Sequence, residues 1–153
     1  RAGCSDLWRQ GPLGSMWAAH SNYAGALTGW EERGPSWRGF ATDGSKELFR
    51  FGSEGAERIC ITEAAIDAMS LAAIEVLRPD TLYVSTGGGW SPATDDAIRG
   101  LAKRANVWLV AATDNNRQGE VYADRIRAIA ADASARYARL RPCAGDWNED
   151  LSA

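Results

Sequence analysis

The spacing of hydrophobic residues changes near residue 58 of the chain. Before that point, short segments alternate polar and apolar positions, and glycine and proline separate them. This pattern is typical of strands in a small antiparallel sheet. The segments are MWAAH (16–20), ALTGW (26–30), SWRGF (36–40) and KELFRF (46–51). The pattern predicts a small β-rich subdomain over residues 1–57.

From residue 58 onward, apolar strand-like runs alternate with segments of helical period. The runs are ICIT (59–62), TLYVS (81–85), VWLVAAT (107–113) and RYARL (136–140). Such alternation predicts βαβ units, and therefore an α/β domain over residues 58–153 with a four-stranded, mainly parallel sheet and helices on both faces.

Three helices are predicted between these strands. The first covers 64–77 and the second covers 92–105, with Ser91 as N-cap and Pro92 in the first turn. The third begins near Gln118. The expected apolar stripes are Ile66, Met69, Ala73 and Leu77 on the first helix, and Tyr122, Ile126, Ile129 and Ala133 on the third.

Composition narrows the functional classes. The 153 residues carry a net charge of −3, which is not the strongly basic balance of a protein that holds DNA by charge alone. No apolar run is long enough for a membrane helix, so no membrane partner is expected. Cys4, Cys60 and Cys143 form no disulfide or zinc pattern, which favours the reducing cytoplasm. His20 is the only histidine, so the chemistry of the second part must use carboxylates, amides, hydroxyls and backbone.

Acidic and amide side chains follow three of the four predicted parallel strands, and glycines follow the remaining one. Because the functional crevice of an open parallel sheet lies at the carboxyl ends of its strands, these residues should meet there. Oxygen ligands without His or Cys select Mg²⁺ or Mn²⁺, which bridge carboxylates to phosphates. The residues are Glu63, Asp67, Asp114, Asn116, Asp146, Gly87 and Gly88.

Each residue taken singly has a simpler structural interpretation. Asp114 and Asp146 could cap helices, Asp67 could pair with a surface arginine, and Gly87–Gly89 could form an ordinary turn. Their shared place at the ends of successive strands favours the metal site.

The ordered motifs resemble the Toprim domain of bacterial primases and topoisomerases. They are Glu63-Ala-Ala-Ile-Asp67, Asp114-x-Asn116-x-x-Gly119 and Asp146-x-Asn148-Glu149. Residues 16–52 are similar to the segment that precedes Toprim in primases, and DWNEDL is similar to Toprim proteins associated with plasmid mobilisation relaxases.

The resemblance implies a role for each of these residues. Glu63 would be the general acid/base, and metal would be bound by Asp67, Asp114, Asn116 and Asp146. Arg33, Lys46, Gly87 and Gly88 would contact nucleic-acid or nucleotide phosphates. The implied partners are DNA, nucleoside triphosphates and other domains of a longer primase or mobilisation protein.

Two departures from the family pattern leave three functions open. Asn116 and Asn148 stand where the pattern has aspartate, and each removes a charge that would attract a divalent cation. The functions are a primase-like nucleotidyltransferase, a Toprim nuclease, and a nucleic-acid-binding or docking module without catalysis. The chain contains no tyrosine in a topoisomerase setting.

Overall fold

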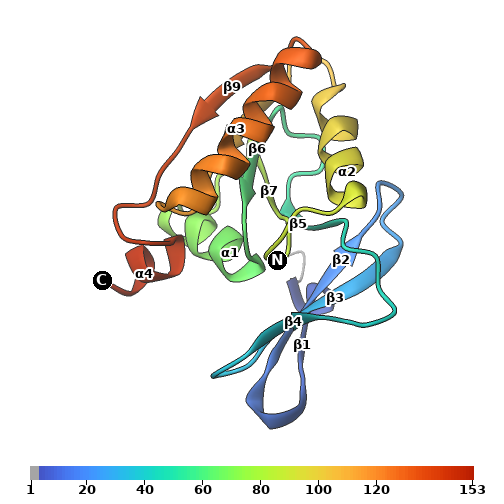
Figure 1. Cartoon of the computed structure of the whole chain (residues 1–153), viewed down its shortest axis with the longest axis vertical. Coiled ribbons are helices and arrows are strands. Elements are labelled where there is room, and N and C mark those ends of the chain that lie inside the picture. The colour runs from blue at the N-terminus through green and yellow to red at the C-terminus, as the bar shows by residue number, and fades with distance from the viewer. Residues whose placement is uncertain (1–3) are drawn as a thin grey trace.

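A computed structural model describes residues 4–153, and its nine strands form one continuous sheet (Figure 1). The strands are β1 (Trp8–Gln10), β2 (Met16–Ser21), β3 (Leu27–Arg33), β4 (Arg38–Phe40), β5 (Leu48–Gly52), β6 (Arg58–Thr62), β7 (Thr81–Ser85), β8 (Trp108–Ala111) and β9 (Arg136–Arg139). The helices are α1 (Ala65–Ile74), α2 (Pro92–Ala102), α3 (Arg117–Asp132) and α4 (Trp147–Ser152). Two 3₁₀ turns, Cys4–Leu7 and Pro12–Gly14, flank β1.

The second half of the chain has the predicted α/β architecture. Strands β7, β6, β8 and β9 are neighbours in that order and pair in parallel. The N-terminal strands pair antiparallel, as their alternating pattern predicts. Strand β5 connects the two parts, because it pairs antiparallel with both β2 and β7. The division of the chain at residue 57 falls in the loop after β5 and stays a prediction.

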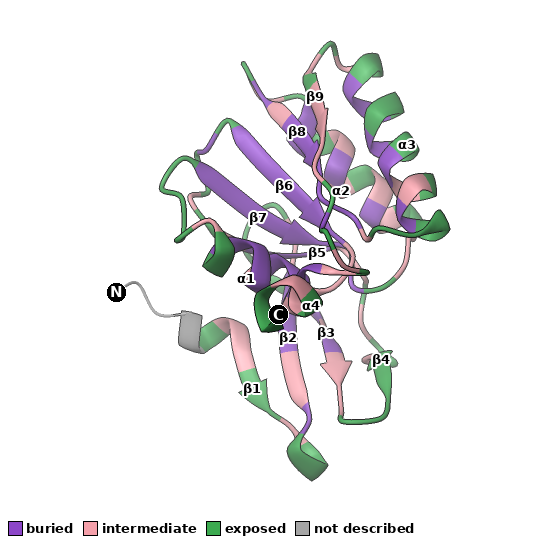
Figure 2. Ribbon diagram, turned by 90° about the vertical axis from the view of Figure 1, so that its left-hand side faces the viewer, coloured by how far each residue is buried: buried purple, intermediate pink, exposed green. Residues whose placement is uncertain are grey.

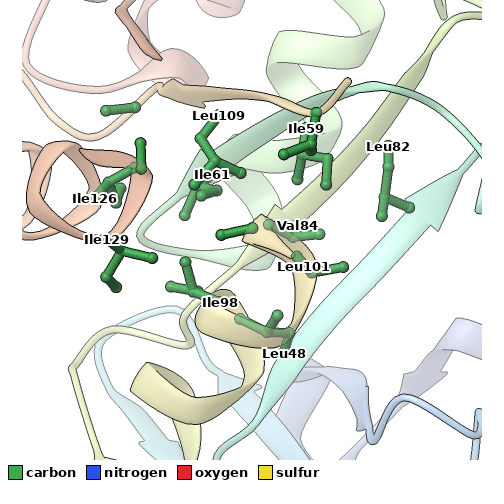
Figure 3. Close-up of a cluster of buried hydrophobic side chains, with 14 of the residues drawn as sticks. Leu48, Ile59, Ile61, Leu82, Val84, Ile98, Leu101, Leu109, Ile126 and Ile129 are labelled. Atoms are coloured by element: carbon green, nitrogen blue, oxygen red, sulfur yellow. The ribbon is translucent and has the colours of Figure 1, made fainter. Parts of the chain in front are cut away.

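Hydrophobic cores lie on both faces of the parallel strands. On one face, α2 and α3 contribute Ile98, Leu101, Ile126 and Ile129 to a cluster with Ile59, Ile61 and Leu82 (Figure 3). On the other face, α1 and α4 pack over Cys60, Tyr83 and Val110. Strands β6 and β7 are buried along their whole length (Figure 2). They therefore form a rigid platform for the loops that leave their carboxyl ends.

Helix α1 buries a different face from the one predicted. Ala73 and Leu77 are exposed, and the core side carries Ala65, Ala68 and Leu71. The reason is that α1 is apolar on almost all sides, so its sequence shows little contrast between an apolar and a polar face. The side that becomes buried is then set by the elements that pack against the helix. In the other helices, the Ser91 N-cap of α2 is confirmed by a hydrogen bond that its side chain accepts from Thr94 N–H, although α2 ends at Ala102 and not at residue 105. Of the stripe predicted for α3, Ile126 and Ile129 are buried and the other two residues are partly buried.

Within residues 4–153, no helix is long and apolar enough to cross a membrane. Cys60 and Cys143 are free thiols, and the side chain of Cys4 lies outside the described part of the chain.

Candidate active site

A pocket of about 380 Å³ opens where the carboxyl ends of the parallel strands face the β3–β4 hairpin. Carboxylates and cations both line this pocket, and β3 contributes Glu31 and Glu32 as well as Arg33. Every site residue predicted from the sequence except Asn116 lines it. Its lining includes Glu63, Asp67, Asp114, Asp146, Arg33, Arg38, Lys46, Gly87 and Gly88.

Glu63 follows β6 directly and faces the loop that follows β8. Its Oε1 accepts a hydrogen bond from the main-chain N–H of Asp114, with a distance of 3.3 Å. Burial raises the pKa of Glu63 to about 7, and the neighbouring Asp114 carboxylate adds to the rise. A carboxyl group with a pKa near neutrality can both accept and return a proton.

Asp67 lies in the first turn of α1 and is 3% exposed. Its Oδ1 accepts a hydrogen bond from Asn148 N–H at 3.3 Å. Burial and, to a smaller extent, repulsion from Asp114 and Asp146 together raise the pKa of Asp67 to about 7. Burial also raises the pKa of Asp114 to about 6. Repulsion between these acids is therefore present, but desolvation has the larger effect on their pKa values.

The Asp114 backbone is fixed by contacts from α3 and β9. Arg139 donates hydrogen bonds to the carbonyl oxygens of Asp114 and Thr113, each at 3.0 Å. Gly119 packs so closely that a Cβ there would lie 2.8 Å from the carbonyl carbon of Asp114. These contacts hold the loop, whereas Oδ1 of Asp114 is buried without a hydrogen-bond partner.

Asn116 and Asp146 both act as helix N-caps. Oδ1 of Asn116 accepts from Gly119 N–H at 2.9 Å, and the exposed Asn116 side chain does not line the pocket. Oδ1 of Asp146 accepts from Glu149 N–H at 2.8 Å at the start of α4, and Asp146 does line the pocket. The capping interpretation of Asp146 therefore holds alongside its place among the acids.

The cations that line the pocket come from the N-terminal part of the chain. Arg33 and Arg38 are directly paired across the β3–β4 hairpin, and both lower the pKa of Asp114 by their charge. Sequence reasoning missed Arg38, although its position across a short turn from Arg33 was a usable signal. Lys46 approaches the glycine loop, since its Nζ would lie 3.4 Å from a Cβ placed on Gly89.

Glu31 of β3 connects the β-rich part to the N-terminus of α1, and it was not identified as a site residue from the sequence. Ala64, the N-cap of α1, provides no side-chain hydrogen bond. Instead both carboxylate oxygens of Glu31 accept from Ala65 N–H, at 3.1 and 3.2 Å. A carboxylate at a helix N-terminus interacts favourably with the helix dipole. Glu31 thereby fixes the end of α1 that presents Asp67.

The donors suit a hard cation that keeps part of its water shell. In residues 4–153, no three His, Cys, Asp or Glu side chains are arranged to hold a metal ion. Mg²⁺, however, needs only one or two protein carboxylates and completes its shell with water and substrate phosphates. The unpartnered Oδ1 of Asp114, beside Asp67 and Asp146, is a donor of that kind.

Comparisons with known proteins agree with this architecture. The model of the Toprim-like family matches residues 60–151. A family described as a protein of unknown function (DUF3991) matches residues 2–57. No curated protein sequence matches significantly.

Solved primase structures share the fold. The primase fragment of the bacteriophage T7 primase-helicase protein superposes with a TM-score of 0.61 at 18% identity, over 95% of this chain and 62% of that chain. The T7 gp4 primase domains, in a complex with lagging-strand DNA polymerase, superpose with a TM-score of 0.60 at 20% identity. The match covers 95% of this chain and 76% of that chain. The RNA polymerase domain of Mycobacterium tuberculosis primase DnaG superposes with a TM-score of 0.54 at 15% identity. The match covers 96% of this chain and 56% of that chain. The chain thus spans somewhat less than two thirds of the T7 primase fragment.

Proposed function

The chain belongs to the Toprim-like family, and we propose that it is a primase-type domain that transfers nucleotides on a DNA template with Mg²⁺ or Mn²⁺. One observation carries the proposal. Three carboxyl groups with raised pKa values, on Glu63, Asp67 and Asp114, line a single pocket together with Arg33 and Arg38.

The acids and the cations of the pocket have distinct parts in this chemistry. A hydrated metal held by Asp114 together with Asp67 or Asp146 would supply the positive charge that phosphoryl transfer requires. Glu63 accepts the proton of the attacking hydroxyl at its carboxylate, for which a pKa of about 7 is well matched. Arg33, Arg38 and Lys46, which line the same pocket, bind the phosphates.

Glycines let phosphates approach the backbone after β7. Gly87 and Gly88 have φ values of +72° and +76°, and a Cβ on Gly87 would lie 2.7 Å from Cε1 of His20. Only glycine fits such a position without strain. We propose that this loop and Lys46 orient the triphosphate.

The test is oligonucleotide synthesis on single-stranded DNA with nucleoside triphosphates and Mn²⁺. Glu63→Gln should lower the rate by roughly 10²–10⁴-fold, which is the usual contribution of a general base. Glu57→Gln, at an exposed residue outside the pocket, is the matched control. Absence of synthesis by the unaltered protein, or full activity of Glu63→Gln, would contradict the proposal. Nicking of supercoiled DNA without triphosphates would indicate the nuclease instead.

A binding module without catalysis is the second candidate. It is favoured by the engagement of Asn116 and Asp146 in helix caps, which leaves fewer free ligands for a metal. Calorimetric titration with Mn²⁺ separates the two: absence of binding at millimolar metal favours the module, and binding that Asp114→Ala abolishes favours catalysis.

The proposed setting is a longer primase or mobilisation protein of a plasmid, in the cytoplasm. Its proposed partners are DNA, nucleoside triphosphates and the other domains of that protein.

A further inference from the structure

A second hollow lies at the tip of the β2–β3 hairpin, beside the C-terminal end of α2. It consists of two adjoining pockets of about 370 and 380 Å³, and neither shares a lining residue with the acidic pocket. Both adjoining pockets are lined by Tyr23, Arg50 and Arg104, and one also by Lys103. We call these four residues the basic groove.

Arg50 is a buried cation whose ion pair with Glu54 is long and leaves its Nε without a partner. The residue is 7% exposed, and its Nε is buried without a hydrogen-bond partner. Its nearest carboxylate is that of Glu54, at 3.6 Å from Nη1, and the Glu54 side chain is 63% exposed. Because one long ion pair with an exposed carboxylate compensates a buried guanidinium only in part, this arrangement favours an anion that enters from outside.

Arg104 and Tyr23 complete the groove. The Arg104 guanidinium lies 5.7 Å from the centroid of the Tyr23 ring, and it donates to the main-chain oxygen of Glu54 at 2.7 Å. Tyr23 is 73% exposed, so its ring is accessible to a flat ligand. With Lys103, the groove carries three cations against the single carboxylate of Glu54.

We propose that the basic groove binds one nucleotide unit of a nucleic-acid strand or of a free mononucleotide. Arg50 and Arg104 bind its phosphate, and the Tyr23 ring stacks on its base. Guanidinium groups match phosphate geometry, and every base offers a face for stacking on an aromatic ring. The inference extends the proposed nucleic-acid function to a second surface, and it does not depend on chemistry at the acidic pocket.

Binding is measured by fluorescence anisotropy without divalent metal, so that failure of the metal site does not affect the result. The probes are a labelled short oligothymidylate and a labelled ATP. Tyr23→Ala and Arg104→Ala should each weaken binding of the responding probe by about fivefold or more. If the oligothymidylate responds, Arg104→Ala should also reduce the salt slope by about 0.7, the value for one phosphate contact on a single strand.

Two further variants keep the test sharp. Glu54→Gln removes the competing carboxylate, so it should tighten binding by about threefold, a gain that misfolding cannot produce. Arg127→Ala removes an equal charge from the exposed side of α3 and should leave binding unchanged.

The probes also identify the ligand. Binding of the oligothymidylate but not ATP indicates a strand, and binding of ATP alone indicates a mononucleotide. The proposal is overturned if neither probe binds, if Tyr23→Ala and Arg104→Ala bind like the unaltered protein, or if Arg127→Ala loses as much affinity.

Discussion

The Glu63 carboxylate and the main-chain N–H of Asp114 are joined by a hydrogen bond of 3.3 Å, although the two residues are 51 positions apart in the chain. This bond links the ends of β6 and β8, which are adjacent parallel strands. It brings the two carboxylates close enough for each charge to disfavour the other, which is the electrostatic condition that a divalent cation relieves.

Metal-free protein should be more stable near pH 5.5 than near pH 8. The folded-state pKa values of Glu63 and Asp67, about 7, lie above their ordinary values, so between about pH 4.5 and 7 the folded chain holds protons that the unfolded chain has released. Raising the pH through this window therefore removes stability. We expect the melting temperature to fall by about 3–8 °C.

Thermal melts in a chelating buffer measure this effect. The double variant Glu63→Gln/Asp67→Asn should lose most of the pH dependence, whereas Glu57→Gln should keep it. A melting temperature that rises between about pH 5.5 and 8 would contradict the raised pKa values.

Gly119→Ala should displace the loop that carries Asp114, because a Cβ at residue 119 would lie 2.8 Å from the Asp114 carbonyl carbon. We expect a fall in melting temperature of more than about 4 °C, together with weaker Mn²⁺ binding. Gly100→Ala is the matched control in α2, since a Cβ there meets nothing within 4 Å. It should stabilise the protein by about 0.5–1 kcal/mol. Equal effects of the two substitutions in denaturant melts would refute the close-approach argument.

Glu31→Ala should destabilise the protein through the N-terminus of α1. The Glu31 carboxylate is the side-chain acceptor for Ala65 N–H, and hydrogen bonds to charged groups contribute about 1.5–3 kcal/mol. Urea unfolding measures the loss, and Glu57→Ala, at an exposed carboxylate, is the control. A loss no larger than that of the control would show that Glu31 does not anchor the helix.

Asn116→Asp should tighten Mn²⁺ binding by about threefold to tenfold, because it adds a negative charge two residues after Asp114 in the same loop. Asp and Ser both cap helices well, so Asn116→Ser is a matched variant that keeps the cap on Gly119 N–H without the charge. Calorimetric titration should therefore separate Asn116→Asp from Asn116→Ser. Identical Mn²⁺ affinities would show that the side chain at residue 116 has no influence on the metal.

Much of the architecture could be predicted from local pattern. The strands β6 to β9 and the helices between them follow from runs that are apolar because both faces of a parallel sheet are buried. The four acids could be predicted as one group, because residues that follow parallel strands must emerge at the same edge. The buried face of α1 could not, because its composition gives no periodic contrast.

Other site residues depend on contacts between distant segments. Arg38 and Glu31 belong to a local hairpin and Arg139 belongs to β9, but their proximity to Glu63, Ala65 and Asp114 depends on how these strands are placed against the ends of β6 and β8 in the folded chain. Arg50 is a similar case, since an arginine in an alternating strand gives no sign that its guanidinium will be buried without an anion.

Local periodicity and the residue types at strand ends are enough to identify the fold class, the family and the grouping of Glu63, Asp67, Asp114 and Asp146. Folding, which brings distant segments together, decided that β5 joins the two parts into one sheet and that Asn116 serves as a helix cap outside the pocket. It also decided which cations line the pocket with the acids. The physical reason is that pairing register and desolvation are properties of segments brought together by folding, and no local pattern of residues specifies them.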